Sequence, residues 1–235
     1  TKRALHEGLE QPVDKFAWVN NAKDIALRLL AADGIDKSTA TEIWGDVDDQ
    51  FFLRERAGDI ARFTKSILAS THKPVILLRD VGVEISVATQ IFVHTSEGEN
   101  LFPIIAVILD KQRLNIVDAR LQTTSDNRTF DVFYVLDEDD RPIGLDAKLS
   151  EKIINALREG IINPASVNFD INRRTPRQLK SFTMKTVVSL RNDKETNTSI
   201  LQVITPDRPG LLAHLASIFS RYELILCNAK ISTLG

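Results

Sequence analysis

The sequence predicts an α+β protein in which a helical segment precedes one whole unit and one partial unit of mixed strands and helices. Three observations support this fold class. Residues 1–70 carry apolar side chains at helical spacing, and from residue 74 onwards β-branched strand patterns alternate with amphipathic helical patterns. Residues 199–235 then align with residues 89–125 at a constant offset of 110 and without a gap.

The first 70 residues are expected to form helices. Apolar residues recur at helical spacing along the first of them, at Phe16, Val19, Ala22, Ile25, Ala26 and Leu29. A second helical piece follows Asp36, with Ser38 or Thr39 as its N-cap, and a third covers residues 58–69. The change to β-branched runs places a domain boundary near residue 70.

A first strand-and-helix unit is expected within residues 71–190. The patterns predict strand 90–95, helix 101–111, strand 114–123, strand 127–136, helix 145–159, a linker at 160–180 and strand 182–190. This βαββαβ order is typical of a ferredoxin-like unit, whose four strands form one antiparallel sheet with both helices on one face. We therefore expect residues 74–95, 114–136 and 182–190 to share a sheet that helices cover on one side.

A second unit is expected to begin within residues 191–235. Eight of the 37 aligned positions are identical, pairing Val93 with Val203, Thr95 with Thr205, Leu101 with Leu211, Ala106 with Ala216, Ile108 with Ile218, Leu114 with Leu224, Ala119 with Ala229 and Thr123 with Thr233. The repeat reaches only its second strand. Because half a sheet leaves an apolar face and strand edges unsatisfied, we expect the natural chain to continue or a partner to complete the unit.

Composition argues against several classes of partner. Lys and Arg number 30 and Asp and Glu number 32, so the charge of −2 indicates neither a nucleic acid nor a membrane surface. No apolar run approaches the roughly 20 residues of a membrane span, and no signal-peptide pattern begins at Thr1. Cys227 is the single cysteine, so an internal disulfide is excluded. Together these features predict a cytoplasmic protein.

Residues 203–219, VITPDRPGLLAHLASIF, join a strand end to an amphipathic helix through a charged turn. Pro209 suits the first turn of a helix, and Gly210, which lacks a Cβ, allows a ligand to approach the backbone. The first N–H groups of the helix can bind a carboxylate, and Asp207 can cap the helix or bind an ammonium group. On the residues alone, this stretch is either a capped turn or a site for an amino acid.

The second repeat resembles the opening half of an ACT domain, a βαββαβ module that binds amino acids, over ITPDRPGLLAHLASIFSRYELILCNAKISTLG. The first repeat fits an ACT unit over TQIFVHT, LNIVDARLQTT and TFDVFYVLDEDDRPI, and the passage between units fits over FTMKTVVSL. Tandem ACT units after a helical segment with IW and FFLRERAGDIARFT resemble the C-terminal region of bacterial PII uridylyltransferase/uridylyl-removing enzymes. The resemblance covers roughly residues 30–235.

This resemblance implies a regulatory region of an enzyme that attaches UMP to the PII signalling protein and removes it, with glutamine as the effector. ACT units are expected to pair within or between chains. The family uses a Gly-Ser motif with paired aspartates for Mg²⁺ and a His-Asp metal cluster for hydrolysis, and neither motif occurs here. We expect no catalytic residue, cofactor or metal in this segment, and Mg²⁺ only in the parent enzyme. The histidines are expected to be surface or packing residues: His6, His72, His94 and His214.

The resemblance also implies which residues bind the effector. The expected set comprises Asp207, Arg208, Pro209, Gly210, Leu211, Leu212, Asn228 and Asp118. The N–H groups of Leu211 and Leu212 are expected to face the start of the second strand of an apposed unit. Asn228 and Asp118 occupy equivalent positions in the two repeats, where an amide offers a donor and an acceptor and a carboxylate offers acceptors. The first repeat has Ser-Glu-Gly-Glu-Asn at 96–100 instead of the Pro-Gly entrance, and this loop is expected to form the opposite wall.

Two other interpretations remain open. The chain could be an ACT module of another amino-acid-regulated enzyme, in which case the helical residues 1–70 would not match the end of a preceding domain. It could also be a structural dimerisation module, because ACT sheets pair side by side without needing a ligand. Calorimetry with the twenty amino acids separates a sensor from such a scaffold.

The missing catalytic motifs lead to a first prediction. The purified 235-residue chain is expected neither to transfer UMP to PII nor to hydrolyse the UMP ester. A radiolabelled uridylylation assay with Mg²⁺ checks this. Detectable transfer by the chain alone would show that the motif analysis missed a catalytic site.

Overall fold

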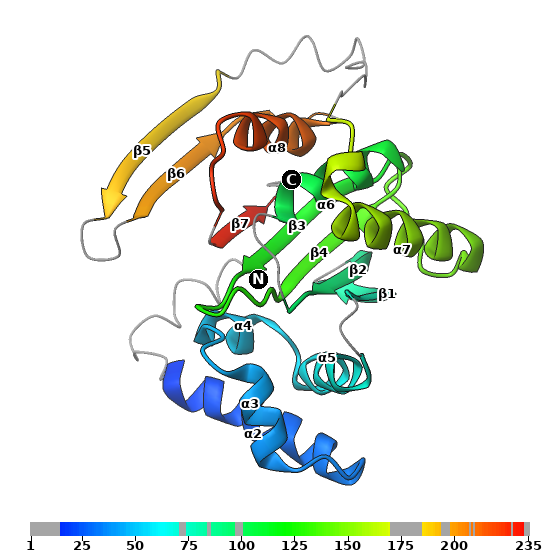
Figure 1. The fold of residues 1–235 in the computed structure, drawn as a ribbon, viewed down its shortest axis with the longest axis vertical. Helices are drawn as coiled ribbons and strands as arrows, with labels where there is room; N and C mark the ends of the chain where they lie inside the picture. The colour runs from blue at the N-terminus through cyan, green and yellow to red at the C-terminus, as the bar shows by residue number, and fades with distance from the viewer. Residues whose placement is uncertain are drawn as a thin grey trace, which may run out of the picture.

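The fold is taken from a computed structural model of the chain. It describes residues 15–70, 74–83, 86–96, 101–169, 185–193, 198–206, 208, 210–226 and 228–232. A five-stranded sheet lies between two layers of helices, with the N-terminal helices on one side and the later helices on the other (Figure 1). The α+β class predicted from the sequence is confirmed.

Two of the four N-terminal helices in the described residues begin at a capping aspartate. The four helices are α2 (Lys15–Ala32), α3 (Lys37–Trp44), α4 (Asp49–Arg54) and α5 (Ala57–Ala69). The α3 N-cap is Asp36, whose carboxylate accepts the Thr39 N–H at 2.8 Å, so the prediction of Ser38 or Thr39 as the cap is wrong. Asp48 caps α4 in the same way, accepting the Gln50 N–H at 2.7 Å. Each such cap stabilises its helix by about 1 kcal/mol.

The main sheet is antiparallel throughout. Its strands are β1 (Val75–Val83), β2 (Ser86–His94), β3 (Asn115–Gln122), β4 (Asp131–Leu136) and β7 (Asn228–Ser232), in the spatial order β1-β2-β4-β3-β7. Helix α6 (Leu101–Lys111) connects β2 to β3, and α7 (Ala147–Ile162) follows β4. Helix α8 (Leu211–Arg221) is the repeat equivalent of α6. After it, the chain adds β7 to the free edge of β3, so the second repeat extends the first sheet.

The prediction that residues 182–190 join this sheet is wrong. Strand β5 (Val187–Asp193) pairs with β6 (Thr198–Ile204) in a separate two-stranded sheet, and residues 182–184 lie outside the described residues. The position beside β2 belongs instead to β1, which forms a hairpin with it. Pairing β1 with β2 closes only the short loop of a hairpin. Pairing β2 with a strand beyond the 160–180 linker would close a much longer loop and would therefore cost more conformational entropy. Each repeat therefore opens with a hairpin, and the expected boundary after residue 190 falls within β5.

The expected helices 101–111 and 145–159 lie on one face of the sheet, as α6 and α7, but the expectation that the other face carries no helices is wrong. Alternate residues of β2 enter different cores: Ile91 and Val93 pack with α6, α7 and α8, whereas Ala88 and Phe92 pack with α2–α5. Both faces of the central strands are thus buried, and all but one residue of β4 is buried. Continuous apolar runs are typical of strands covered on both sides, and Val132 and Phe133 follow that rule in β4.

Aromatic side chains join the N-terminal helices to the sheet. The ring of Phe63 on α5 stacks on Phe92 of β2, with centroids 3.9 Å apart and planes within 6° of parallel. Phe51 on α4 meets Phe130 edge to face at 5.8 Å. Both Phe63 and Phe92 are at most 1% exposed. The helical segment and the sheet therefore share one core.

None of the helices in the described ranges combines the length and the hydrophobicity required to cross a lipid bilayer.

The shared core predicts that the helical segment and the sheet unfold together. Replacing Phe92 with Ala is expected to lower the free energy of unfolding by about 3–5 kcal/mol, because a buried ring is lost from between two layers. Urea denaturation followed by circular dichroism measures this change. Phe16→Ala is the matched control, since the Phe16 side chain is 72% exposed and its removal is expected to change little.

Asp131, the first residue of β4, gives the stability a pH dependence. Its carboxyl is buried and accepts the Gln122 N–H at 3.0 Å, and burial raises its pKa to about 7. The folded state therefore favours the protonated acid, so this group's contribution to stability is largest below pH 4 and is lost as the pH rises to about 7.

Asp131→Asn removes this titration while keeping the acceptor oxygen. Relative to the unchanged chain, the variant is expected to gain stability progressively between about pH 4 and pH 7, by up to about 4 kcal/mol, and to gain no more above that range. Urea titrations at a series of pH values measure the difference. A difference that does not vary with pH would show that Asp131 is ionised in the folded state.

Candidate functional site

The structure brings four of the predicted effector-binding residues together at the start of α8. Arg208, Gly210, Leu211 and Leu212 line a small cavity of about 30 Å³. Its other wall comes from the end of α6 and the start of β3: Ala106, Asp110, Leu114, Asn115 and Ile116, with Ala213 beside them on α8. This wall includes the start of the second strand of the first repeat, β3, together with residues of α6. Asp207, Pro209 and residues 97–100 of the loop 96–100 lie outside the described residues.

The remaining two predicted residues are not at this cavity. Asp118 lies on β3 and forms an ion pair with Arg120 at 3.1 Å, on the face of the sheet that meets the N-terminal helices. Asn228 begins β7 and pairs with Gln122, and its side chain is outside the described part of the chain. Repeat-equivalent positions therefore lie at opposite ends of the paired strands, because the two strands run antiparallel.

The first turn of α8 leaves backbone donors available. Gly210 is the N-cap with φ 79°, a left-handed conformation that suits glycine, and in the described chain no side chain caps this end. The Leu211 N–H already donates to the Arg208 carbonyl at 3.0 Å, so that predicted donor is in use. The N–H groups of Leu212 and Ala213 are the ones that face the positive end of the helix without an intrahelical partner.

The two repeats meet around an approximate two-fold axis. In the β3–β7 ladder Arg120 is opposite Lys230, Asp118 is opposite Ser232 and Gln122 is opposite Asn228. Lys230 is the residue that the offset of 110 aligns with Arg120. The repeat-equivalent helices α6 and α8 also pack together, with the rings of Phe102 and Phe219 at 6.2 Å. The small cavity thus lies between two copies of one structural unit.

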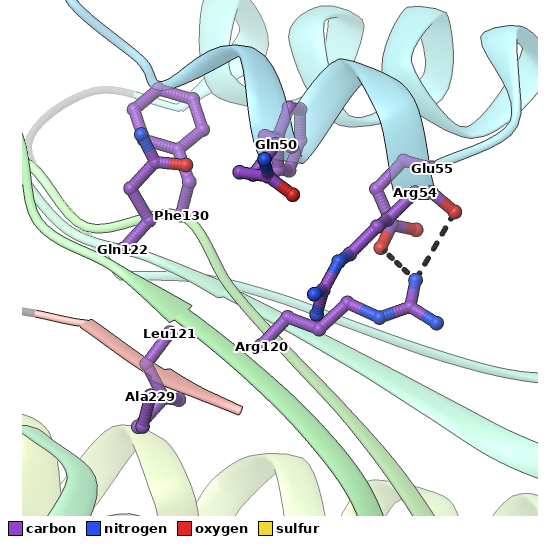
Figure 2. A pocket seen from close by; sticks show the side chains of 9 residues that line it. Gln50, Arg54, Glu55, Arg120, Leu121, Gln122, Phe130 and Ala229 are labelled. Carbon is purple, nitrogen blue, oxygen red and sulfur yellow. Dashed lines mark hydrogen bonds and ion pairs between the residues drawn. The ribbon is translucent and has the colours of Figure 1, made fainter. Parts of the chain in front are cut away.

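A second and larger cavity, of about 130 Å³, lies on the other side of the sheet. It lies between α4 and strands β3 and β7, and its lining residues are Gln50, Phe51, Arg54, Glu55, Arg120, Leu121, Gln122, Phe130 and Ala229. In Figure 2 the side chains of Gln50, Arg54 and Glu55 reach the cavity from the α4 side. Those of Arg120 and Gln122 reach it from β3. Sequence analysis did not predict this site.

A buried ion pair forms one end of the larger cavity. Arg120 donates to the Glu55 carboxylate at 2.6 Å and to the Arg54 carbonyl at 3.1 Å (Figure 2). Only 1% of the Glu55 side chain is exposed, and this burial raises the pKa of Glu55 while the charge of Arg120 opposes the rise. Arg120 also forms an ion pair with Asp118 on its own strand. Through Glu55 it connects β3 to the residue that follows α4.

The ion pair belongs to a polar network that crosses the helix–sheet junction. Gln90 on β2 is 1% exposed, accepts from Arg62 of α5 at 2.8 Å and lies within hydrogen-bond distance of Tyr134. Asp59 of α5 forms an ion pair with Arg79 of β1. The sequence signal for this network is a glutamine in the middle of an apolar strand, VATQIFV, because a buried amide needs partners.

The described residues contain no cluster of His, Cys, Asp and Glu arranged to hold a metal ion. His94 is a packing residue: it is buried against Phe130, its Nδ1 lies 2.7 Å from the Thr129 carbonyl, and burial lowers its pKa to about 4. His214 is exposed on α8, and His6 and His72 lie outside the described residues.

Comparison with known proteins identifies relatives for the whole chain. The family model for the uridylyltransferase GlnD fifth domain matches residues 14–66, which cover the N-terminal helices. A bifunctional uridylyltransferase/uridylyl-removing enzyme of Pseudomonas fluorescens is 37% identical over 100% of this chain and 26% of its own length. That of Azotobacter vinelandii is 39% identical with the same coverage. No solved structure matches.

The chain spans about a quarter of the length of these curated relatives. The aligned region includes the helical segment and both repeats. Over its whole length the chain is therefore a relative of the bifunctional uridylyltransferase/uridylyl-removing enzymes, and the resemblance predicted from the sequence is confirmed.

Proposed function

We propose that the chain is the glutamine-sensing regulatory region of a PII uridylyltransferase/uridylyl-removing enzyme, built from tandem ACT units. The observation that carries this proposal is the cavity at the start of α8, which lies between two repeated units and combines backbone donors with a carboxylate. The family match of residues 14–66 favours this enzyme over another amino-acid-regulated protein, because it covers the segment that precedes the repeats.

The chemistry of this cavity suits an amino acid. The α-carboxylate binds the N–H groups of Leu212 and Ala213 at the positive end of α8. Asp110, in the last turn of α6, lines the opposite wall and attracts the ammonium group. Arg208 is exposed beside the entrance and adds positive charge near the carboxylate. The two ends of the ligand thus contact different repeats.

The size of the cavity implies that binding changes the packing of the repeats. At about 30 Å³ the cavity is small for an amino acid, so we expect glutamine to widen the space between α8 and the wall formed by α6 and β3. A movement of α8 displaces β7, which is paired with β3. An effector that binds the two arrangements with different affinity shifts their equilibrium, typically by about 1–3 kcal/mol.

In this proposal the rest of the enzyme, working in the cytoplasm with Mg²⁺, performs uridylylation and removal on PII, and this region biases it. A structural dimerisation module without a ligand is the competing function. It predicts no saturable heat when glutamine is titrated into the chain, whereas the sensor predicts glutamine as the strongest binder among the twenty amino acids.

Gly210→Val tests the site directly. A Cβ at φ 79° strains the backbone, and the added methyl groups crowd the start of α8, so the apparent Kd for glutamine is expected to rise by at least about tenfold. Isothermal titration calorimetry of the chain measures binding, and circular dichroism checks the fold. Gly34→Val is the matched control, because Gly34 also has φ 79° and its substitution meets no atom within 4 Å.

The control variant is expected to bind glutamine with unchanged affinity despite the same backbone strain. Equal affinities for Gly210→Val and the unchanged chain would mean that the start of α8 is a turn and that the sensor lies elsewhere. In the full-length enzyme, the concentration of glutamine that switches activity is expected to rise with Gly210→Val and to stay constant with Gly34→Val.

A further inference from the structure

The larger cavity beneath α4 carries polar groups without partners. The side chains of Gln50 and Arg54 on α4 and of Gln122 on β3 all line it, and none of them has a hydrogen-bond or ion-pair partner in the described part of the chain. Two amides and a guanidinium group therefore converge on one space. Pockets that bind small molecules typically combine a few converging polar groups with an apolar wall.

One guanidinium group at this cavity has no carboxylate partner in the described part of the chain. The ionisable groups that line the cavity are two guanidinium groups and one carboxylate. Arg120 is bonded to the carboxylates of Glu55 and Asp118, whereas the exposed side chain of Arg54 forms no ion pair there. A guanidinium group presents parallel N–H donors that match a carboxylate.

The apolar part of the lining limits the ligand further. Phe51 and Phe130 are buried and belong to the core on this side of the sheet, whereas Leu121 and Ala229 line the cavity from strands whose side chains at these positions pack in the core on the other side. The cavity volume of about 130 Å³ is small, so it suits a short ligand. A bare inorganic anion leaves the apolar wall without contacts, whereas a short carbon chain covers it.

We propose that this cavity is a second ligand site, which binds a small organic monocarboxylate. The carboxylate is held by Arg54, the carbon chain packs on Phe51 and Phe130, and a polar substituent reaches Gln50 or Gln122. The site is separate from the proposed glutamine site, which is formed by α6, α8 and the start of β3. The two cavities have no lining residue in common.

The position of the cavity gives its occupant a structural effect. Its lining comes from α4 of the helical segment, from β3 of the first repeat and from β7 of the second. A ligand there contacts all three parts at once, beside the ion pair of Arg120 and Glu55. Binding therefore stabilises the arrangement in which the helical segment is docked on both repeats.

Isothermal titration calorimetry of the 235-residue chain with sodium propionate, butyrate, pentanoate and hexanoate tests the proposal. Affinity is expected to rise with chain length until the cavity is full and then to fall. Butyramide, which lacks the charge, is expected to bind at least about tenfold more weakly than butyrate. Inorganic phosphate and sodium chloride report any binding that depends on charge alone.

Two arginine variants show whether the acids bind in the cavity. Arg54→Gln is expected to raise the Kd for butyrate by at least about tenfold, whereas Arg28→Gln, at an exposed position on α2 away from the cavity, keeps the Kd within about twofold. Gly210→Val is expected to keep butyrate binding, which separates this site from the glutamine site.

Three results would overturn the proposal. The first is the absence of saturable binding by every acid in the series. The second is equal affinity for phosphate and butyrate, which would indicate attraction of any anion to a surface charge. The third is the same Kd for Arg54→Gln and Arg28→Gln, which would place the bound acid elsewhere on the chain.

Discussion

Arg120 and Glu55 form the contact on which the arrangement of the three parts depends. Glu55 is buried at the end of α4, and its carboxylate is tolerated there because Arg120 donates to it at 2.6 Å. Removing one partner of a buried ion pair leaves an uncompensated charge and costs about 3–5 kcal/mol. Arg120 lies on β3, which pairs with β4 along one edge and with β7 along the other. The helical segment is thus tied to the strand where the two repeats meet.

The two-fold relation of the repeats places this contact at their junction. Arg120 is opposite its own repeat equivalent, Lys230, so the axis passes through the middle of the β3–β7 ladder. Residues of α8 and β7 pack in the same core, and β7 pairs with the strand that carries Arg120. The same strand supplies one wall of each cavity, Ile116 to the smaller and Gln122 to the larger. The two cavities, on opposite faces of the sheet, therefore share one structural element, β3.

Local patterns predicted the parts of the fold that local physics determines. The helical spacing predicted α2, and Val19 and Ala26 of its predicted apolar stripe are buried, although Phe16 and Leu29 are exposed. The offset of 110 identified α6 with α8 and β3 with β7. The start of α8 at Gly210 was also predicted from the residues. The packing of the N-terminal helices on the second face of the sheet was not predicted, because it depends on contacts between distant elements, such as Phe63 with Phe92. Likewise, Glu55 and Arg120 are 65 residues apart, and each alone resembles an ordinary surface charge.

Hydrogen exchange with and without saturating glutamine tests the central claim, that effector binding between the repeats reaches the helical segment through β3. The account predicts altered exchange in α8, in β7 and β3, and in the amides of α4 and Glu55, with the change at α4 reduced in Arg120→Met because the ion pair is lost. Altered exchange limited to α8, or an α4 response that is identical in Arg120→Met, would contradict the account.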